Sequence, residues 1–215
     1  MTYVSWAALY EGESDANYLE IIIRRLMEEI IWERQQRNSE IPEGSVVRLQ
    51  RQSIDEVARE ACDARDAFHL LFIHADTGGR ALEMTLEQRS LNYCKAINEL
   101  CGWPPVRCIV IAPRHETEAW LLADPDAVTS ALGYSGSPSS VELPEGPQQA
   151  ERLTDPKAVL ERAITNIRGR RHRAKASDLY ASIAQRQSFA ILRQSASFTK
   201  FECALLAALR DIGSI

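Results

Sequence analysis

The sequence has 215 residues, of which 45% are hydrophobic and 26% charged, the ordinary balance of a globular protein. This length suits one large domain, alone or with a small appendage, and argues against a coiled coil, a peptide-like module or a multi-domain machine. No apolar run approaches the roughly 18 residues that span a membrane, and no basic segment followed by an apolar one opens the chain. We therefore expect a cytoplasmic protein without a membrane partner.

The cysteines are five in number and include no C-x-x-C pair. An odd set without that motif, in a chain of this size, predicts no disulfide framework. We expect most of them to be small buried hydrophobic residues. They are Cys62, Cys94, Cys101, Cys108 and Cys203.

Strand and helix signals alternate over the first 125 residues. Residues 3–10 form an apolar run, and the helical spacing of the apolar residues after Asp15 predicts a long helix. Residues 45–49 indicate a short strand. Ser53 and Glu56 then form a capping box, which predicts the start of a second helix.

Two further apolar runs, at residues 68–73 and 106–112, are typical of strands buried on both faces. Between them Thr85 and Gln88 form a second capping box, and a last short helix is expected to end at Pro125. Strands and helices that alternate in this way predict an α/β fold, with a mostly parallel, Rossmann-like sheet and helices on both faces.

Residues 133–150 are rich in proline and glycine, which indicates a loop or linker. Helical stretches follow at residues 157–167, 177–187 and 199–210. We therefore predict an α/β domain over residues 1–132, the linker, and a helical extension over residues 151–215 that packs on the sheet.

Carboxylates follow three of the predicted strands. They are Glu11, Glu13 and Asp15, then Asp76, then Glu116 and Glu118. The ligand site of an open α/β sheet lies outside the carboxyl ends of its strands, so these groups should gather at one edge and need a cation to offset their repulsion. Hard oxygen ligands suit Mg²⁺ or Mn²⁺ rather than Zn²⁺. The alternative is that these acids serve as helix caps and first-turn charges.

Two histidines and one lysine are further candidates for the predicted site. His74 and His115 each follow a strand, where a histidine is either a hydrogen-bonded structural group or a general acid or base beside a metal. Lys157 opens a helix after Asp155-Pro156 and could stabilise a phosphorane-like transition state. It could equally be an exposed surface lysine.

A basic stretch lies between residues 168 and 175, without an aromatic residue. Its members are Arg168, Arg170, Arg171, Arg173 and Lys175. Residues 156–175 carry a net charge of +6, which leaves −11 for the remainder of the chain. Such a stretch is expected to contact the phosphates of nucleic acid without sequence preference, or else to form a solvated basic face.

The motif Tyr10-Glu-Gly-Glu-Ser-Asp15, an apolar strand ending in Glu-Gly before a helix, resembles the opening of a Toprim domain, in the form closest to the overcoming-lysogenization-defect (OLD) nucleases. The stretch from His115 to Asp124, with Leu179-Tyr-Ala-Ser-Ile-Ala184 and Ser197-Phe-Thr-Lys-Phe201, resembles a compact Toprim-like family found beside ATPase genes in bacterial defence loci. Together the resemblance covers most of the chain.

The resemblance implies that Glu11 and Asp15 are the first acidic pair, Asp76 an aspartate of the Asp-x-Asp motif, and Glu118 the later acid. This sequence departs from the motif. His74-Ala-Asp76 lacks the first aspartate, and the other alignment, Asp76-Thr-Gly78, lacks the second. We expect His74 to compensate in part for the missing aspartate. The catalytic lysine matches either Lys157 or Lys175.

We therefore expect a Mg²⁺- or Mn²⁺-dependent nuclease, with DNA favoured over RNA and an ATPase as partner protein. The metal ligands would be Glu11, Asp15, Asp76, Glu116 and Glu118, and the catalytic groups Glu11, His74 and Lys157. The alternative is a partner or regulatory subunit that lacks a complete site and binds an ATPase or nucleic acid without cleaving.

Overall fold

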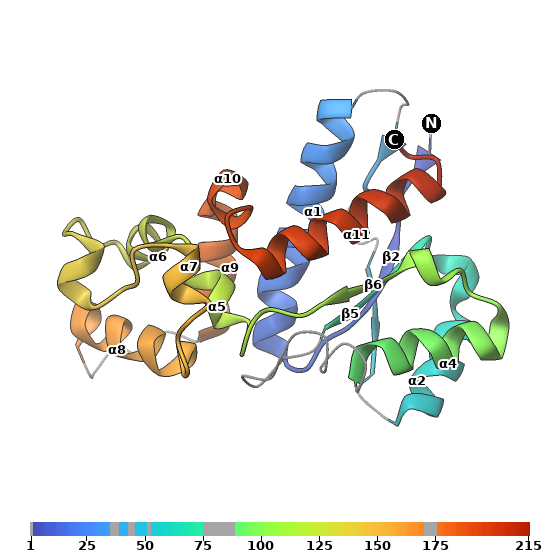
Figure 1. Cartoon of the computed structure of the whole chain (residues 1–215), viewed down its shortest axis with the longest axis horizontal. Helices are drawn as coiled ribbons and strands as arrows, with labels where there is room; N and C mark the ends of the chain where they lie inside the picture. Colours follow the sequence, from blue (N-terminus) through green and yellow to red (C-terminus); the bar gives the residue numbers. More distant parts are fainter. Residues whose placement is uncertain (1, 35–38, 43–45, 51–52, 75–88, 170–175) are drawn as a thin grey trace.

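The computed structural model describes residues 2–34, 39–42, 46–50, 53–74, 89–169 and 176–215. The main sheet has four parallel strands in the order β4-β2-β5-β6 (Figure 1). Its strands are β2 (Trp6–Leu9), β4 (Val46–Leu49), β5 (Leu70–His74) and β6 (Cys108–Ile111). The predicted α/β fold with a parallel sheet is confirmed. The predicted first strand is divided, because β1 (Thr2–Tyr3) pairs instead with β3 (Ser39–Glu40).

Helices cover both faces of this sheet and extend beyond one end of it (Figure 1). They are α1 (Glu13–Arg34), α2 (Ile54–Asp63), α4 (Leu91–Cys101), α5 (Glu118–Leu121), α6 (Pro125–Leu132), α7 (Pro147–Ala150), α8 (Pro156–Arg168), α9 (Ala176–Arg186), α10 (Phe189–Leu192) and α11 (Ala196–Asp211), with 3-10 turns η1 (Arg65–Ala67), η3 (Pro105–Arg107) and η4 (Pro138–Val141). In the part of the chain that the structure describes, none is long and apolar enough to cross a membrane.

Side chains of the central strands alternate between two cores, as the period of a strand requires. Ala8 and Phe72 lie in the core shared with α1 and α11, where the Phe72 and Phe201 rings are 6.3 Å apart. Leu9 and Ile73 face the opposite core, which α2 and α4 cover. Burial on both faces explains why these strands read as unbroken apolar runs.

The structure confirms one predicted helix start and gives one predicted helix-ending proline a different role. The predicted capping box of α2 is confirmed: Ser53 Oγ accepts the backbone N–H of Glu56, whose carboxylate accepts that of Ser53. The second box, at Thr85 and Gln88, lies outside the described residues. Pro125 was expected to end a helix, but it begins α6, with the Asp124 carboxylate as its cap. Proline suits a first helical position because no backbone N–H is needed there.

The helical segment continues the core on the α1 side of the sheet. Within residues 133–150, predicted to be a linker, η4 and α7 contribute buried Val141 and Ala150 to that core. Beyond it, α9 packs along α1, and α11 packs against β6. The boundaries predicted at residues 132 and 150 stay a prediction.

Four of the five cysteines are paired, so the prediction that they form no disulfide framework is wrong. Cys62–Cys101 joins α2 to α4, and Cys94–Cys108 joins α4 to β6, with Cα separations of 5.9 and 5.7 Å. Cys203 is a free, exposed thiol. Cys94 and Cys101 lie about two turns apart on α4, which lets one helix be linked to both of its neighbours. This arrangement follows from packing and has no signature in the cysteine spacing.

Reduction of the two disulfide bonds should lower the thermal stability, because each bond restricts the unfolded chain and stabilises the fold by about 3 kcal/mol. We expect the melting temperature to fall by at least about 5 °C with a phosphine reductant. Alkylation of the unfolded protein should find one thiol before reduction and five after it. The variant Cys203→Ser is the control and should show the same fall. Five thiols in protein purified without reductant would contradict the pairing.

Candidate functional site

The carboxyl ends of β2, β5 and β6 meet at one edge of the sheet, because these strands are parallel and adjacent. Glu11 and Asp15 follow β2, His74 ends β5, and Glu118 begins α5 after β6. Gly12 allows the backbone to approach Asp15 closely, since a Cβ atom at Gly12 would lie 3.1 Å from Asp15 Oδ2. The strand ends therefore bring several of the predicted site residues together.

His74 is the buried centre of this edge, with 3% of its surface exposed. Nδ1 lies 3.3 Å from the carbonyl oxygen of Ile111. A carbonyl can only accept, so Nδ1 carries the hydrogen of that bond. On the other side of the ring, Nε2 lies 3.1 Å from Thr117 Oγ1 and 3.7 Å from Asp15 Oδ1. One imidazole thus contacts elements that follow or end all three strands.

Asp15 is an anion held by its neighbours. Burial would raise the pKa of its carboxyl, but hydrogen bonding to His74 and the charge of that ring, with hydrogen bonds from Thr117 and the Gly12 backbone, bring the pKa below its usual value. Asp15 therefore remains ionised well into the acidic range.

Glu118 shows the opposite shift. Its carboxyl accepts a 2.5 Å hydrogen bond from the Tyr180 hydroxyl, which α9 supplies. Burial raises the pKa of Glu118 despite that bond, and the negative charges of Glu116 and Asp15 raise it further. The pKa of Tyr180 is also raised, by burial and by Glu118, so the phenol stays a hydrogen-bond donor. The charges of Glu116 and Asp15 are therefore close enough to Glu118 to disfavour its ionisation.

The loop that delivers Glu116, Thr117 and Glu118 contains a strained residue. His115 has φ of 68°, in the left-handed region that a residue with a side chain rarely adopts. The backbone N–H of Glu116 donates to the carbonyl of Arg114 at 3.0 Å, which closes a tight turn there. Such strain persists where surrounding contacts impose it, and it is concentrated at functional sites.

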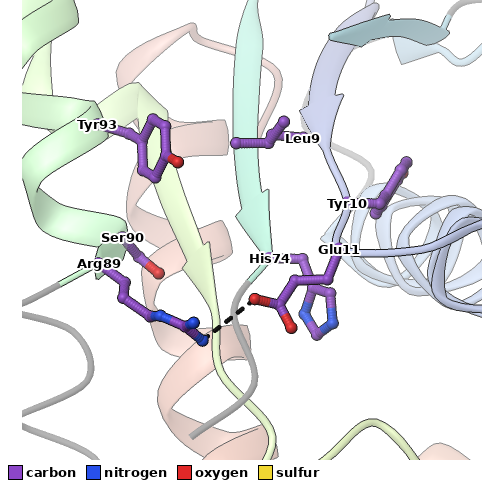
Figure 2. Close-up of a pocket in the computed structure, with 7 residues that line it drawn as sticks. All are labelled: Leu9, Tyr10, Glu11, His74, Arg89, Ser90 and Tyr93. Atoms are coloured by element: carbon purple, nitrogen blue, oxygen red, sulfur yellow. Dashed lines mark hydrogen bonds and ion pairs between the residues drawn. The ribbon is translucent and has the colours of Figure 1, made fainter. Parts of the chain in front are cut away.

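Glu11 is directed to a second region, next to the acids. Its carboxylate accepts a hydrogen bond from Arg89 at 3.2 Å across a cavity of about 90 Å³. Leu9, Tyr10, His74, Ser90 and Tyr93 complete the lining of this cavity. Figure 2 shows the Arg89 side chain extending from the α4 side of the cavity to Glu11 at the end of β2. His74 lines this cavity and also contacts Asp15, so the two regions adjoin.

The remaining predicted residues are placed differently. Asp76, Arg170, Arg171, Arg173 and Lys175 lie outside the described residues. Lys157 is exposed on α8, and Arg168 ends that helix with a bond to the Ala131 carbonyl. Among the residues that the structure describes, no group of three or more His, Cys, Asp or Glu side chains has metal-binding geometry.

Three contributors to this edge were not predicted from the sequence. Tyr180 and Arg89 reach it from α9 and from the start of α4, far along the chain from their acidic partners. Thr117 lies between two predicted acids, and only its contact with His74 identifies it. A hydroxyl or arginine paired with a strand-end acid needs the tertiary structure to be found.

The fold and site define an α/β protein whose parallel sheet carries half-buried and buried acids and a buried histidine at its carboxyl edge. The chain belongs to the family described as "Domain of unknown function (DUF4276)", which matches residues 10–206. No curated protein and no solved structure matches it. The match includes every predicted site residue.

Replacing Glu118 by glutamine and Asp15 by asparagine should change the thermal stability in opposite directions at pH 7. A glutamate whose pKa is raised by folding stabilises the fold below its unfolded pKa and loses this contribution as pH rises through the folded pKa. Glu118→Gln should therefore raise the melting temperature at pH 7, by roughly 2 °C or more, and have little effect near pH 4.

Asp15→Asn is the matched comparison. Its lowered pKa stabilises the fold above the unfolded pKa, and this contribution is lost as pH falls through the folded pKa. The amide should thus lower the melting temperature at pH 7, with the deficit shrinking below about pH 4. Melting curves from pH 3 to 8 test both; shifts of the same sign at pH 7 would contradict the electrostatic description.

Proposed function

We propose that this protein is a divalent-metal-dependent nuclease that hydrolyses phosphodiester bonds, with DNA favoured over RNA. The observation that supports this most is that Glu118 lies close enough to Asp15 and Glu116 to be affected by their negative charges, beside the Asp15–His74 contact. Burial and like charge raise the pKa of Glu118, which is the condition that a bound cation would relieve. Carboxylate oxygens are the ligands that Mg²⁺ and Mn²⁺ prefer.

Asp15, Glu116 and Glu118, with Glu11 and Asp76, would hold Mg²⁺ or Mn²⁺. A metal bound by these residues would supply an activated water and charge stabilisation at the phosphate. Tyr180 holds the Glu118 carboxylate in place through its hydroxyl. His74, with its Nδ1 hydrogen bonded to Ile111, keeps Nε2 toward Asp15 and Thr117, where it can hold or transfer a proton.

The resemblance to Toprim-like nucleases adds the biological setting to the proposal. From this resemblance we propose a role within a bacterial defence system that has an ATPase partner, and we propose that the protein acts in the cytoplasm. Glu11 and either Lys157 or Lys175 would assist His74 in catalysis, and Arg168 with the basic residues 170–175 would bind the backbone of the nucleic acid.

The second candidate function is a partner subunit that binds an ATPase or nucleic acid without cleavage. The ion pair of Glu11 with Arg89 favours it, since an arginine already neutralises one of the acids assigned to the metal. The incomplete Asp-x-Asp motif at Asp76 favours it as well. In this role the acidic edge would be a docking surface.

Metal binding and DNA cleavage distinguish the nuclease from the partner subunit. A ligand that binds only the folded state at about 100 times its dissociation constant stabilises it by about 2.7 kcal/mol, so Mn²⁺ should raise the melting temperature of the parent by about 5 °C or more. Asp15→Asn and Glu118→Gln should lose most of this rise and all plasmid cleavage. Glu99→Gln, a change at an exposed acid on α4, should behave as the parent.

Cleavage should be assayed with Mg²⁺ and with Mn²⁺, with and without the neighbouring ATPase, and circular dichroism should establish that each variant is folded. The nuclease proposal fails if parent and variants respond equally to Mn²⁺ and none cleaves. That result would favour the partner subunit.

The basic stretch has its own test. Changing Arg170, Arg171 and Arg173 to alanine should weaken binding to all nucleic-acid sequences and lower the salt slope by about one unit for each lost phosphate contact. Filter binding between about 50 and 200 mM salt measures the slope. The exposed residues Arg59 and Arg65, changed together to alanine, provide the control. An unchanged slope in the triple variant would identify the stretch as a solvated face.

A further inference from the structure

The cavity between Glu11 and α4 is a small polar compartment beside the acids. Its volume of about 90 Å³ is well below the roughly 300–1,000 Å³ of sites that enclose a cofactor or nucleoside. It is large enough for a single small group such as a phosphoryl group. Glu11, His74, Arg89, Ser90 and Tyr93 bring hydrogen-bonding or charged atoms to its lining.

Ser90 is the first sign of a ligand in this cavity. The residue is fully buried, with 0% of its surface exposed, and its hydroxyl has no hydrogen-bond partner among the residues that the structure describes. A buried hydroxyl without a partner is costly, and most such groups in proteins are satisfied by a neighbour or by a bound molecule. Ser90 and Tyr93 are three residues apart at the start of α4, so they face the same side.

Arg89 is the second sign, because its charge is directed into the same space. It reaches the Glu11 carboxylate with 55% of its side chain still exposed, so a guanidinium is held at the mouth of the cavity (Figure 2). A guanidinium binds carboxylate and phosphate oxygens with the same forked geometry. The Glu11 carboxylate therefore occupies the position that another oxyanion would take.

We propose that this cavity is a phosphate subsite, in which Arg89 and Ser90, with the Tyr93 hydroxyl, bind one phosphodiester group of a nucleic-acid strand. That source of the phosphate rests on the proposed nuclease function. The sugars and bases stay outside, because the cavity has no room for them. His74 lines the subsite and also contacts Asp15, so a bound phosphate would lie next to the acidic cluster of Asp15, Glu116 and Glu118.

The subsite implies an exchange of partners at Arg89. Glu11 pairs with Arg89 when the cavity holds no anion, and an incoming phosphate replaces that carboxylate on the guanidinium. Glu11 is thereby released toward the acidic cluster when substrate binds. Arg89 is thus a phosphate-binding residue that also controls the position of Glu11.

Phosphate binding without metal is the test, so that it is independent of catalysis. Titration calorimetry in EDTA would measure inorganic phosphate and the dinucleotide TpT, which contains only an internal phosphodiester. Arg89→Ala should weaken binding of TpT about tenfold or more, since a charge-assisted pair is lost. The affinity of Arg89→Lys for TpT should lie between those of the parent and Arg89→Ala, because lysine keeps the charge but lacks the forked geometry of the guanidinium.

Three further variants complete the set. Ser90→Ala should weaken TpT binding several-fold, whereas Glu11→Gln should strengthen it, since the competing carboxylate is removed. Lys95→Ala is the matched control: it removes a cation from an exposed position of α4 and should leave the affinity unchanged. Circular dichroism of each variant excludes unfolding.

The outcomes separate this proposal from that of the nuclease. Equal affinities for the parent, Arg89→Lys and Glu11→Gln would overturn the subsite, even if the protein cleaves DNA with Mn²⁺. If TpT binding is lost only in the Arg89 and Ser90 variants, and the protein never cleaves nucleic acid, the result would support the subsite. The protein would then be a nucleic-acid-binding protein without nuclease activity. Binding of inorganic phosphate but not of TpT would overturn the phosphodiester assignment.

Discussion

The buried ring of His74 connects the three strand ends on which the candidate site is built. It is bonded to the backbone of β6 on one side, and on the other it contacts the first turn of α1 and the loop before α5. A polar ring is tolerated at this depth because both nitrogens have partners. The geometry of Asp15, the Thr117 loop and the neighbouring cavity therefore depends on one side chain at the end of β5.

The sheet provides only part of the site, and the helical segment provides the rest. Tyr180 reaches Glu118 because α9 packs along α1, and that packing is held by polar contacts. Gln187 accepts a 2.6 Å hydrogen bond from Tyr18 and donates to the carbonyls of Trp120 and Leu121, while Arg25 donates to the Gln187 carbonyl. These buried bonds are specific in direction, so they set the position of α9 more narrowly than apolar packing alone would.

The sequence predicted the fold and the location of the site better than its contacts. Apolar runs on both sides of a helix signal define a parallel sheet, and the ends of parallel strands converge by geometry, so Asp15, His74 and Glu118 could be expected at one edge. The Tyr180 contact and the cysteine pairs could not, because each joins elements whose relative placement depends on the whole core. Pro125 shows a local ambiguity: the same residue can follow one helix or begin the next, and only the Asp124 cap decides.

The separation in sequence between partners has a consequence for how the molecule acquires its site. Tyr18 and Gln187 are 169 residues apart, and Tyr180 is 62 residues beyond Glu118. During synthesis the strands and their acids leave the ribosome well before α9 does. Contacts between such distant segments form late, because closing a long loop costs entropy before the contact offsets it. A nascent chain therefore carries the acids without the tyrosine that holds Glu118, and the site is assembled only when α9 docks.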